Sequence, residues 1–183
     1  MFFKENIVFI LIMLSLILPN DDYIIITTSE YVDAAEVISN IHSNDVSESY
    51  KLTTKVIYLD EFNWYDTSND SLQYLIREEI LRQGDIKYLL LLGNEETIPP
   101  IYITATDGSQ QPSDDFYSCS ENISTFMQLE NFIPQVSTGR IPVDNPNTAN
   151  TIAQKLYNYM INPTIGVWRS NIGLIADDEN KNG

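Results

Sequence analysis

Residues 85–100 of this chain are Asp-Ile-Lys-Tyr-Leu-Leu-Leu-Leu-Gly-Asn-Glu-Glu-Thr-Ile-Pro-Pro. The apolar run at residues 86–92 is too short for a stable helix and is typical of a parallel strand that is buried on both faces. Gly93 then allows a sharp turn. Because Glu95 and Glu96 follow so closely, we expect them at the carboxyl edge of a parallel sheet, where open α/β sheets bind their ligands. Taken alone, however, the two glutamates fit a solvated acidic loop better.

The segments before this strand alternate between strand and helix patterns. Runs rich in β-branched residues predict strands at residues 23–28 and 55–59. Apolar periodicity predicts a helix after each strand, with Ser29 as the N-cap of the first, and Asp70 starting the second, where Gln73 can complete a capping box. The order β-α-β-α-β requires parallel strands joined by right-handed crossovers. We therefore predict a three-layer α/β/α fold with a mostly parallel sheet.

The second half of the chain has a less regular pattern. Residues 101–133 show no clear periodicity, and a long excursion of this kind in a compact domain is usually functional or disordered. A strand is predicted at residues 136–143, where a glycine and a proline indicate an edge or a bend. A long amphipathic helix with Asn145 as its N-cap follows, and a last strand is expected at residues 171–176.

The composition is that of a strongly acidic globular protein. The chain has 183 residues, about the length of one domain, of which 43% are hydrophobic, and its formal net charge is −16. This charge argues against nucleic acid as a partner, because the phosphate backbone would repel the protein. The single cysteine, Cys119, cannot form an internal disulfide and is more typical of a small buried side chain than of a nucleophile.

The amino terminus has features of an export signal. Residues 7–18 are almost wholly apolar, with the length of the central region of a signal peptide, and are too few for a comfortable membrane span. Glu5 cancels the charge of Lys4 and no small residues mark a cleavage site, so the alternative is an uncleaved anchor or a buried segment. We expect residues 1–19 to be a signal-peptide-like segment and residues 20–183 to form the domain.

Acidic side chains gather after the predicted parallel strands, namely Glu30, Asp60, Glu95, Glu96, Asp177, Asp178 and Glu179. Because the carboxyl ends of parallel strands share one edge of a sheet, these side chains should form one rim. Close carboxylates repel one another unless a cation neutralises them. Calcium, which takes about six to eight oxygen ligands, fits such a rim. The alternative is that these loops are acidic only because the whole protein is acidic.

No complete catalytic motif is present in the sequence. It has no glycine-rich phosphate loop, no nucleophile elbow of the serine hydrolases and no Cys/His metal cluster. The one histidine, His42, is expected to be solvated at the end of the first helix, where the helix dipole favours a cation. A dyad of His42 and Cys119 is not favoured, because the two residues lie on dissimilar elements that do not direct them to a common point.

Four segments, taken in order, carry a resemblance to a known family. They are residues 87–99 around the central strand, Ser-Asp-Asp-Phe-Tyr at 113–117, Pro-Gln-Val-Ser-Thr-Gly-Arg-Ile-Pro at 134–142, and Trp-Arg-Ser-Asn-Ile-Gly-Leu-Ile-Ala-Asp at 168–177. Together they resemble the gingipain-type cysteine peptidases, a family that includes the cell-surface sortase of the type IX secretion system. The resemblance spans about residues 22–179. It implies a caspase-like α/β fold with two side-by-side subdomains, of which this chain matches the first.

The resemblance implies a cysteine endopeptidase whose catalytic cysteine and histidine belong to the second subdomain. The chain as given is therefore expected to be inactive alone. Glu179 aligns with the glutamate that orients the histidine in this family. The resemblance also implies a structural calcium ion and no organic cofactor. Asp114, Asp177 and Asp178 are the candidate ligands, and Asp114 has the alternative role of shaping the substrate cleft.

The implied partners are a protein or peptide substrate and the missing carboxyl-terminal catalytic subdomain, with no nucleic acid. The implied location is outside the cell or at the cell surface of a bacterium or archaeon. Without the second subdomain, an apolar edge at residues 172–175 is expected to be exposed and to favour association.

Two other functions stay open from the residues alone. One is a non-catalytic α/β module that binds a cation or a protein partner through its acidic rim. The other is a flavodoxin-like or receiver-like domain with Mg²⁺ at the strand ends. The long excursion at residues 101–133 and the absence of a strand-end lysine argue against a receiver.

Overall fold

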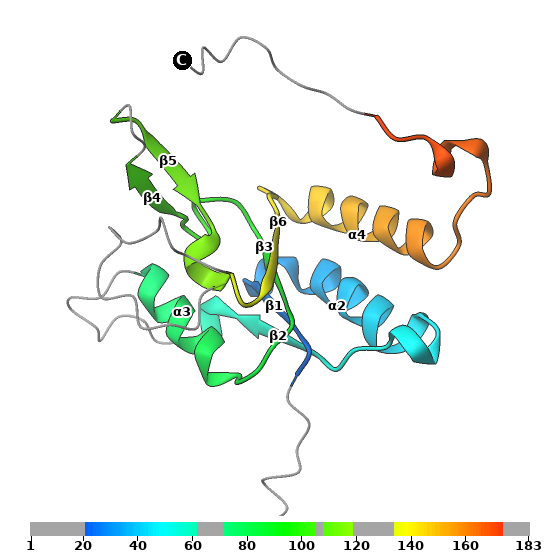
Figure 1. Cartoon of the computed structure of the whole chain (residues 1–183). Helices are drawn as coiled ribbons and strands as arrows, with labels where there is room; N and C mark the ends of the chain where they lie inside the picture. The colour runs from blue at the N-terminus through cyan, green and yellow to red at the C-terminus, as the bar shows by residue number, and fades with distance from the viewer. Residues whose placement is uncertain (1–20, 62–71, 105–107, 119–133, 174–183) are drawn as a thin grey trace, which may run out of the picture.

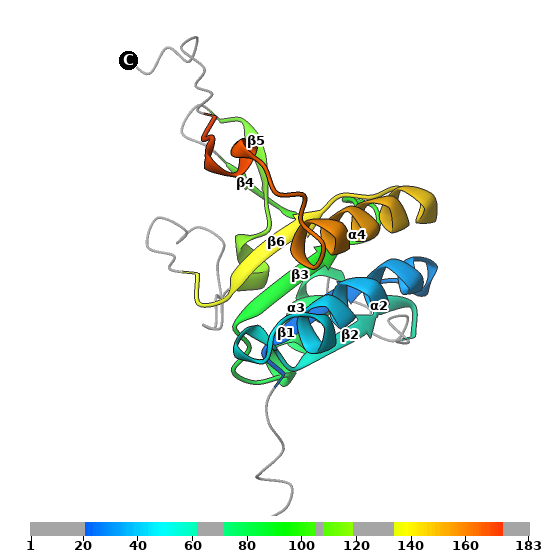
Figure 2. The ribbon, with the colours of Figure 1, turned by 90° about the vertical axis from the view of Figure 1, so that its right-hand side faces the viewer.

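The structure is a computed structural model that describes residues 21–61, 72–104, 108–118 and 134–173. Its main sheet has four parallel strands in the order β2-β1-β3-β6 (Figures 1 and 2). The strands are β1 (Tyr23–Thr27), β2 (Thr54–Tyr58), β3 (Tyr88–Leu92) and β6 (Ser137–Ile141). The main helices are α2 (Val32–Asn40), α3 (Leu72–Arg82) and α4 (Pro146–Met160).

Helices cover both faces of this sheet (Figure 2). Successive residues of β1 point to opposite faces, so that Ile24 and Ile26 pack in the core with α3, whereas Ile25 packs in the core with α2 and α4. In β3, residues 89–92 are all buried. Burial on both faces explains why these strands are unbroken apolar runs without a polar alternation. The predicted α/β fold with a mostly parallel sheet is confirmed.

A hairpin extends beyond the main sheet (Figure 1). It consists of β4 (Ile101–Thr104) paired antiparallel with β5 (Gln110–Ser113), and the 3-10 helix η6 (Asp115–Ser118) follows it. The expectation of irregular structure from residue 101 onward is therefore wrong for this part, and residues 119–133 lie outside the described residues. The polar sequence of β5 has little strand propensity of its own. The hairpin is anchored by η6, whose Phe116 and Tyr117 are buried in the core beneath α3.

The helix starts agree only partly with the prediction. Asn145 caps α4 as expected, because its side-chain oxygen accepts a backbone N–H of the first turn at 2.9 Å. The predicted cap of the first helix is wrong. Ser29 lies in the 3-10 turn η1 (Ser29–Tyr31) before α2, and its hydroxyl donates a hydrogen bond to Asp60 after β2, so it does not cap the helix. Asp70, the predicted start of the second helix, lies outside the described residues.

The chain after α4 also differs from the prediction. The 3-10 helix η8 (Val167–Ser170) is followed by residues 171–173, which are not in a strand. The rest of the predicted strand and residues 1–19 lie outside the described part of the chain. Ile172 is 87% exposed, while association through this end stays a prediction. Among the helices that the structure describes, every one is too short or too polar to cross a membrane.

Substituting Gly93 tests the turn that ends β3. Gly93 is buried with φ +154°, and an added Cβ would lie 3.1 Å from two side-chain carbon atoms of Thr97. We expect Gly93→Ala to lower the free energy of unfolding in urea by about 1–2 kcal/mol, because an L-residue is strained there. Gly139→Ala is the control, since its Cβ would meet no atom within 4 Å. Equal unfolding midpoints for the two variants would contradict this account.

Candidate functional site

A turn built on Asn94 closes the carboxyl end of β3. The Asn94 side-chain oxygen accepts hydrogen bonds from the backbone N–H groups of Glu96, at 3.1 Å, and Thr97, at 3.0 Å. The Thr97 hydroxyl donates to the same oxygen at 3.1 Å. The backbone N–H of Ile98 donates to the Asn94 carbonyl at 2.9 Å. With the turn fixed in this way, the side chains of Glu95 and Glu96 are exposed at the edge of the sheet.

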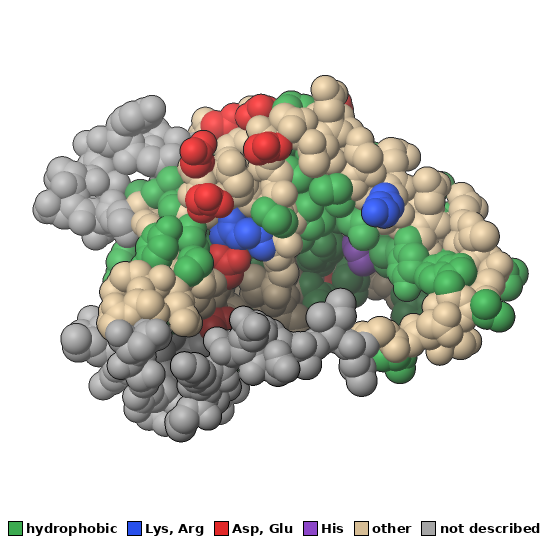
Figure 3. All heavy atoms as spheres, turned by 90° about the horizontal axis from the view of Figure 1, so that it is seen from above, with side chains coloured by type: hydrophobic (Ala, Val, Ile, Leu, Met, Phe, Trp, Pro, Cys, Tyr) green, Lys and Arg blue, Asp and Glu red, His purple; other side chains and the backbone are tan. Residues whose placement is uncertain are grey.

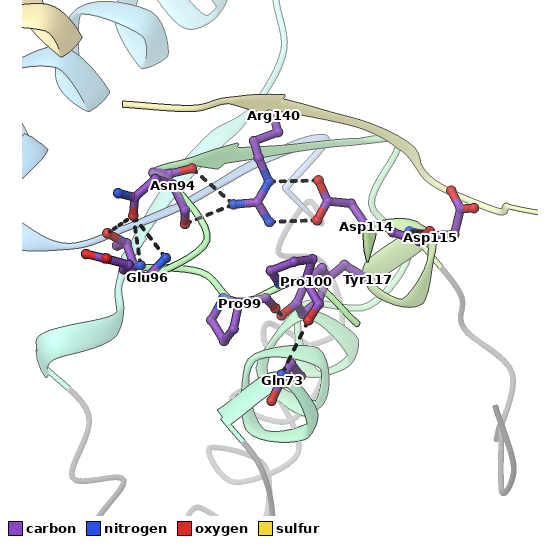
Figure 4. Close-up of polar contacts among 12 residues, drawn as sticks. Gln73, Asn94, Glu96, Pro99, Pro100, Asp114, Asp115, Tyr117 and Arg140 are labelled. Atoms are coloured by element: carbon purple, nitrogen blue, oxygen red, sulfur yellow. Dashed lines mark hydrogen bonds and ion pairs between the residues drawn. The ribbon is translucent and has the colours of Figure 1, made fainter. Parts of the chain in front are cut away.

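The central feature of this edge is what we call the Arg140 clamp, formed by Arg140, Asp114, Gly93 and Asn94 (Figure 4). Arg140, on β6, donates from Nε and Nη2 to the two carboxylate oxygens of Asp114, at 2.8 and 2.6 Å. Its Nη1 donates to the carbonyl oxygens of Gly93, at 3.0 Å, and Asn94, at 3.2 Å. The Arg140 and Asp114 side chains are 16% and 28% exposed. The clamp therefore joins β3, β6 and the start of η6 by charge-assisted hydrogen bonds.

The sequence itself contains one signal for the clamp. Arg140 is a charged residue within the predicted strand at 136–143, and a charge there needs a partner when it is partly buried. Asp114 was identified as a candidate site residue, but its pairing with Arg140 was not predicted.

The two prolines after the turn are held by neighbouring elements (Figure 4). The Tyr117 hydroxyl donates to the carbonyl of Pro99 at 2.5 Å, and the Gln73 side chain on α3 donates to the carbonyl of Pro100 at 3.4 Å. Burial raises the pKa of Tyr117, so its hydroxyl stays protonated as a donor at neutral pH. Helix α3, η6 and the proline segment consequently fix one another beside the clamp.

Two hollows lie along this edge. The first, which we call the Glu95 hollow, has a volume of about 330 Å³ and is lined by Glu95, Pro100, Tyr102, Pro112, Ser113, Asp114 and Arg140. The second, the Asp60 hollow, has a volume of about 580 Å³ and is lined by Thr28, Ser29, Glu30, Leu59, Asp60, Leu72, Glu96 and Thr97. Figure 3 shows acidic side chains gathered around a basic one on one face of the molecule.

The structure brings together part of the predicted acidic rim. Glu30, Asp60 and Glu96 come from the ends of three different strands and line the same hollow, as the topology predicted. Two hydrogen bonds from Ser29, one from its hydroxyl and one from its backbone N–H, lower the pKa of Asp60. Glu95 faces the neighbouring hollow instead.

Of the three candidate calcium ligands, the described residues include only Asp114. Both carboxylate oxygens of Asp114 accept hydrogen bonds from Arg140, so a metal ion at Asp114 would have to displace the clamp. Across the described ranges, no group of three or more His, Cys, Asp or Glu side chains could hold a metal ion. Asp177, Asp178 and Glu179 lie outside these ranges, so their roles stay predictions.

A third hollow lies at the opposite edge of the sheet and contains His42. Its volume is about 920 Å³, and its lining includes Tyr23 and Tyr88, which begin β1 and β3. The His42 ring packs edge-to-face on Tyr23, with 4.9 Å between ring centroids and 80° between ring planes. Figure 3 shows histidine surface within a depression bordered by hydrophobic side chains.

His42 lies in the last helical turn, as expected, but it is half-buried and not fully solvated. The chain continues from α2 into a π-helical turn, Ile41–Asp45, which carries the ring into the half-buried hollow. Burial there lowers the pKa of His42, because the cation is less well solvated than in water. Cys119 lies outside the described residues, so the structure does not test a dyad of the two.

Comparison with known proteins gives a family and a set of related folds. The sequence model of peptidase family C25 matches residues 17–183. No curated protein sequence matches the chain.

Among solved structures, dimeric latent PorU from Porphyromonas gingivalis is similar with a TM-score of 0.62 and 14% identity, over 85% of this chain and 17% of PorU. A structure described as a protease has a TM-score of 0.55 and 17% sequence identity, and the match covers 79% of this chain and 29% of the protease. The Arg-specific cysteine proteinase gingipain R has a TM-score of 0.52 and 21% sequence identity, and the match covers 76% of this chain and 28% of gingipain R. These likenesses show a common fold, and the chain spans less than a third of each of these proteins.

Replacing Arg140 tests the clamp. We expect Arg140→Lys to lower the free energy of unfolding by about 2–3 kcal/mol, because a lysine ammonium cannot make the paired contact to Asp114 and also reach both carbonyls. Arg82→Lys is the matched control, since Arg82 is 67% exposed in its ion pair with Glu79, and should cost less than about 0.5 kcal/mol. In urea unfolding, Arg140→Lys combined with Asp114→Asn should cost less than the sum of the single changes. Strict additivity would show that the pair is not coupled.

The depressed pKa of His42 predicts a loss of stability in mild acid. The unfolded chain takes up a proton near pH 6.5, while the folded chain does so only at lower pH. The stabilising effect is therefore complete above pH 6.5 and declines as the pH falls through the folded-state pKa. Urea unfolding between about pH 7 and 5 should show this slope, and His42→Phe should lack it. An unchanged slope in His42→Phe would assign the effect to other groups.

Proposed function

Because the chain belongs to peptidase family C25, we propose that it is part of an exported cysteine endopeptidase that hydrolyses peptide bonds with a cysteine and a histidine outside residues 1–183. The observation that carries this proposal is the family match over residues 17–183, which includes every described strand of the sheet. The chain spans less than a third of the similar solved proteins, so most of such an enzyme would be supplied by other residues.

The proposed chemistry is acyl transfer through a thioester. The histidine takes the proton of the cysteine thiol, and the thiolate sulfur attacks the carbonyl carbon of the substrate peptide. The tetrahedral intermediate collapses while the histidine gives its proton to the leaving amine, and water then hydrolyses the acyl-enzyme. In this scheme Glu179 accepts a hydrogen bond from the second ring nitrogen of the histidine, which fixes the tautomer and stabilises the imidazolium.

The described residues would contribute a rigid edge beside that chemistry. The Arg140 clamp fixes the carboxyl ends of β3 and β6 relative to η6. Ligands of open α/β sheets bind at the carboxyl ends of the strands. A substrate peptide that lies along this edge would therefore meet preorganised backbone, which reduces the entropy lost on binding.

The proposed location is outside the cell or at the cell surface of a bacterium or archaeon. The apolar run at residues 7–18 and the resemblance to gingipains support export. The proposed substrates are proteins or peptides, and the net charge of −16 would attract those with basic segments.

A second candidate function is binding of a cation or a protein partner through the acidic rim, without catalysis. The observation in its favour is that Glu30, Asp60 and Glu96 line one hollow. Because these side chains are not grouped so that they could hold a metal ion, this hollow favours a basic protein partner over a cation. Calcium held by Asp177 and Asp178 would belong to this alternative or would serve the peptidase as a structural ion. Calcium titration followed by calorimetry, together with a hydrolysis assay of the full-length protein, would separate the two functions, because only the peptidase cleaves peptides. A flavodoxin-like or receiver-like domain is not proposed, since the chain belongs to a peptidase family.

The full-length protein with Glu179→Gln tests the peptidase proposal. We expect hydrolysis of peptides by the wild type, its loss after alkylation with iodoacetamide, and a fall in kcat of at least about a hundredfold in the variant. Without the carboxylate the imidazolium is less stable, so the alkaline limb of the pH–rate profile should move to lower pH. Glu48→Gln, which makes the same change of charge at a side chain that is 88% exposed, is the control and should keep the wild-type profile. Absence of hydrolysis by the wild type would reject the peptidase function, and an unshifted profile in Glu179→Gln would reject the orienting role.

A further inference from the structure

The β4–β5 hairpin has backbone groups that point away from it along both of its outer edges. The register places Tyr102 opposite Pro112 and Thr104 opposite Gln110. In an antiparallel ladder, pairs that exchange both backbone hydrogen bonds alternate with pairs that exchange none. Because Pro112 has no N–H, Tyr102 and Pro112 form a pair that exchanges none, and so do Thr104 and Gln110. The backbone groups of these four residues therefore point outward.

The two outer edges differ in whether another strand can add to them. On the edge of β5, Pro112 offers no donor, and a proline is a common way of blocking an edge. On the edge of β4, Tyr102 and Thr104 each present an N–H and a carbonyl, and neither has a backbone hydrogen bond to any other part of the described chain. The sequence of β4, Ile-Tyr-Ile-Thr, has high strand propensity throughout. A further strand can therefore pair with β4 and not with β5.

The hairpin would gain stability from such a strand. A two-stranded hairpin is marginally stable in water, and three or more strands are usually needed. The hairpin extends beyond the main sheet (Figure 1). On β4, Ile101 is buried but Tyr102 is 59% exposed, and most of β5 is exposed. Added strands would cover part of this surface.

The charge of the hairpin indicates what kind of partner fits. Residues 101–104 and 108–113 contain no charged side chain, although the net charge of the chain is −16. Edge strands of natural proteins are often protected by charged side chains, and β4 has none. A basic partner would find no carboxylate on this strand. A second copy of the chain can pair here without placing like charges opposite each other.

The strand β4 is complementary to a second copy of itself. An antiparallel pairing about a two-fold axis at Ile103 places Tyr102 opposite the partner's Thr104, and Thr104 opposite the partner's Tyr102. All of these residues have outward backbone groups, so both pairs would exchange both of their hydrogen bonds. Each pair also joins an aromatic to a β-branched side chain, a favourable combination across strands. Since the edge of β5 is blocked, the assembly would close at two copies.

We infer that the free edge of β4 pairs with β4 of a second copy of this chain, which forms a four-stranded sheet β5-β4-β4-β5 and a closed dimer. Because Tyr102 also lines the Glu95 hollow, the partner strand would lie at the border of that hollow. The inference does not rest on the proposed peptidase function.

Sedimentation velocity of the full-length protein tests this pairing. We expect a reversible equilibrium of monomer and dimer between about 1 and 100 µM, since dimer formation follows mass action. Tyr102→Pro should raise the dissociation constant about thirtyfold, because the dimer loses one hydrogen bond from each chain, while the ladder within the hairpin does not use this N–H. Gln110→Pro is the matched control, because it removes an outward N–H from the blocked edge of β5, and it should leave the dissociation constant unchanged. Urea unfolding of both variants as monomers checks that they fold.

Two further changes test the register and the role of charge. The double change Tyr102→Glu with Thr104→Glu would place carboxylates opposite each other across the interface and should abolish the dimer. The double change Tyr102→Lys with Thr104→Glu would place opposite charges there and should retain it. Because the two copies carry like net charge, the wild-type dimer should tighten as ionic strength rises from about 0.05 to 0.5 M.

Four results would overturn the inference. They are a protein that stays monomeric at every concentration, a dimer that Tyr102→Pro leaves unchanged, an equal weakening by Tyr102→Pro and Gln110→Pro, and assemblies that grow beyond two copies. Hydrogen exchange identifies the alternative occupant. A monomer in which the Tyr102 amide exchanges slowly would show that another segment of the same chain pairs with β4.

Discussion

The guanidinium of Arg140 makes four hydrogen bonds, and the carboxyl edge of the sheet depends on them. Asp114 lies 26 positions away from Arg140 in the sequence, and Gly93 lies 47 positions away. Local sequence propensity therefore cannot specify these contacts. The end of a strand leaves carbonyl oxygens without ladder partners, and an unsatisfied carbonyl in a partly buried place costs free energy. Arg140 satisfies two of them while Asp114 neutralises its charge. The Arg140 clamp therefore satisfies the carbonyls at the end of β3 and neutralises the charge of Arg140.

The strands of the main sheet could be predicted because a strand that is buried on both faces is a continuous apolar run in the sequence. β1 is a run of isoleucines and β3 a run of leucines, and neither pattern requires knowledge of what packs on it. The hairpin could not be predicted in the same way. The strand β5 is Gln-Gln-Pro-Ser, and its place depends on Phe116 and Tyr117, which are buried beneath a helix far away in sequence. Ser29 shows the same limit, because a serine suited to capping a helix found a stronger partner in Asp60.

The sequence could predict which residues of the candidate site lie at the edge of the sheet, but not which of them contact one another. The rule that parallel strands end at one edge correctly grouped Glu30, Asp60 and Glu96 around one hollow. It could not show that Glu95, next to Glu96 in the chain, faces a different hollow, since that depends on the turn that Asn94 closes. The rule also could not show which cationic side chain pairs with Asp114, because the residue type indicates that a partner is needed but does not identify it.

The acidic side chains of this edge differ in whether other groups of the protein already stabilise their negative charge. For cation binding, this difference matters more than the number of acidic side chains. Asp60 receives two hydrogen bonds from Ser29, which stabilise its charged form and lower its pKa. Asp114 is neutralised by Arg140. A ligand cation at either carboxylate would have to compete with these existing partners, and its gain would be reduced by what the protein loses. Glu95 has no such partner among the described residues. The uncompensated charge of this edge is accordingly found at Glu95, beside the internally neutral pair of Arg140 and Asp114.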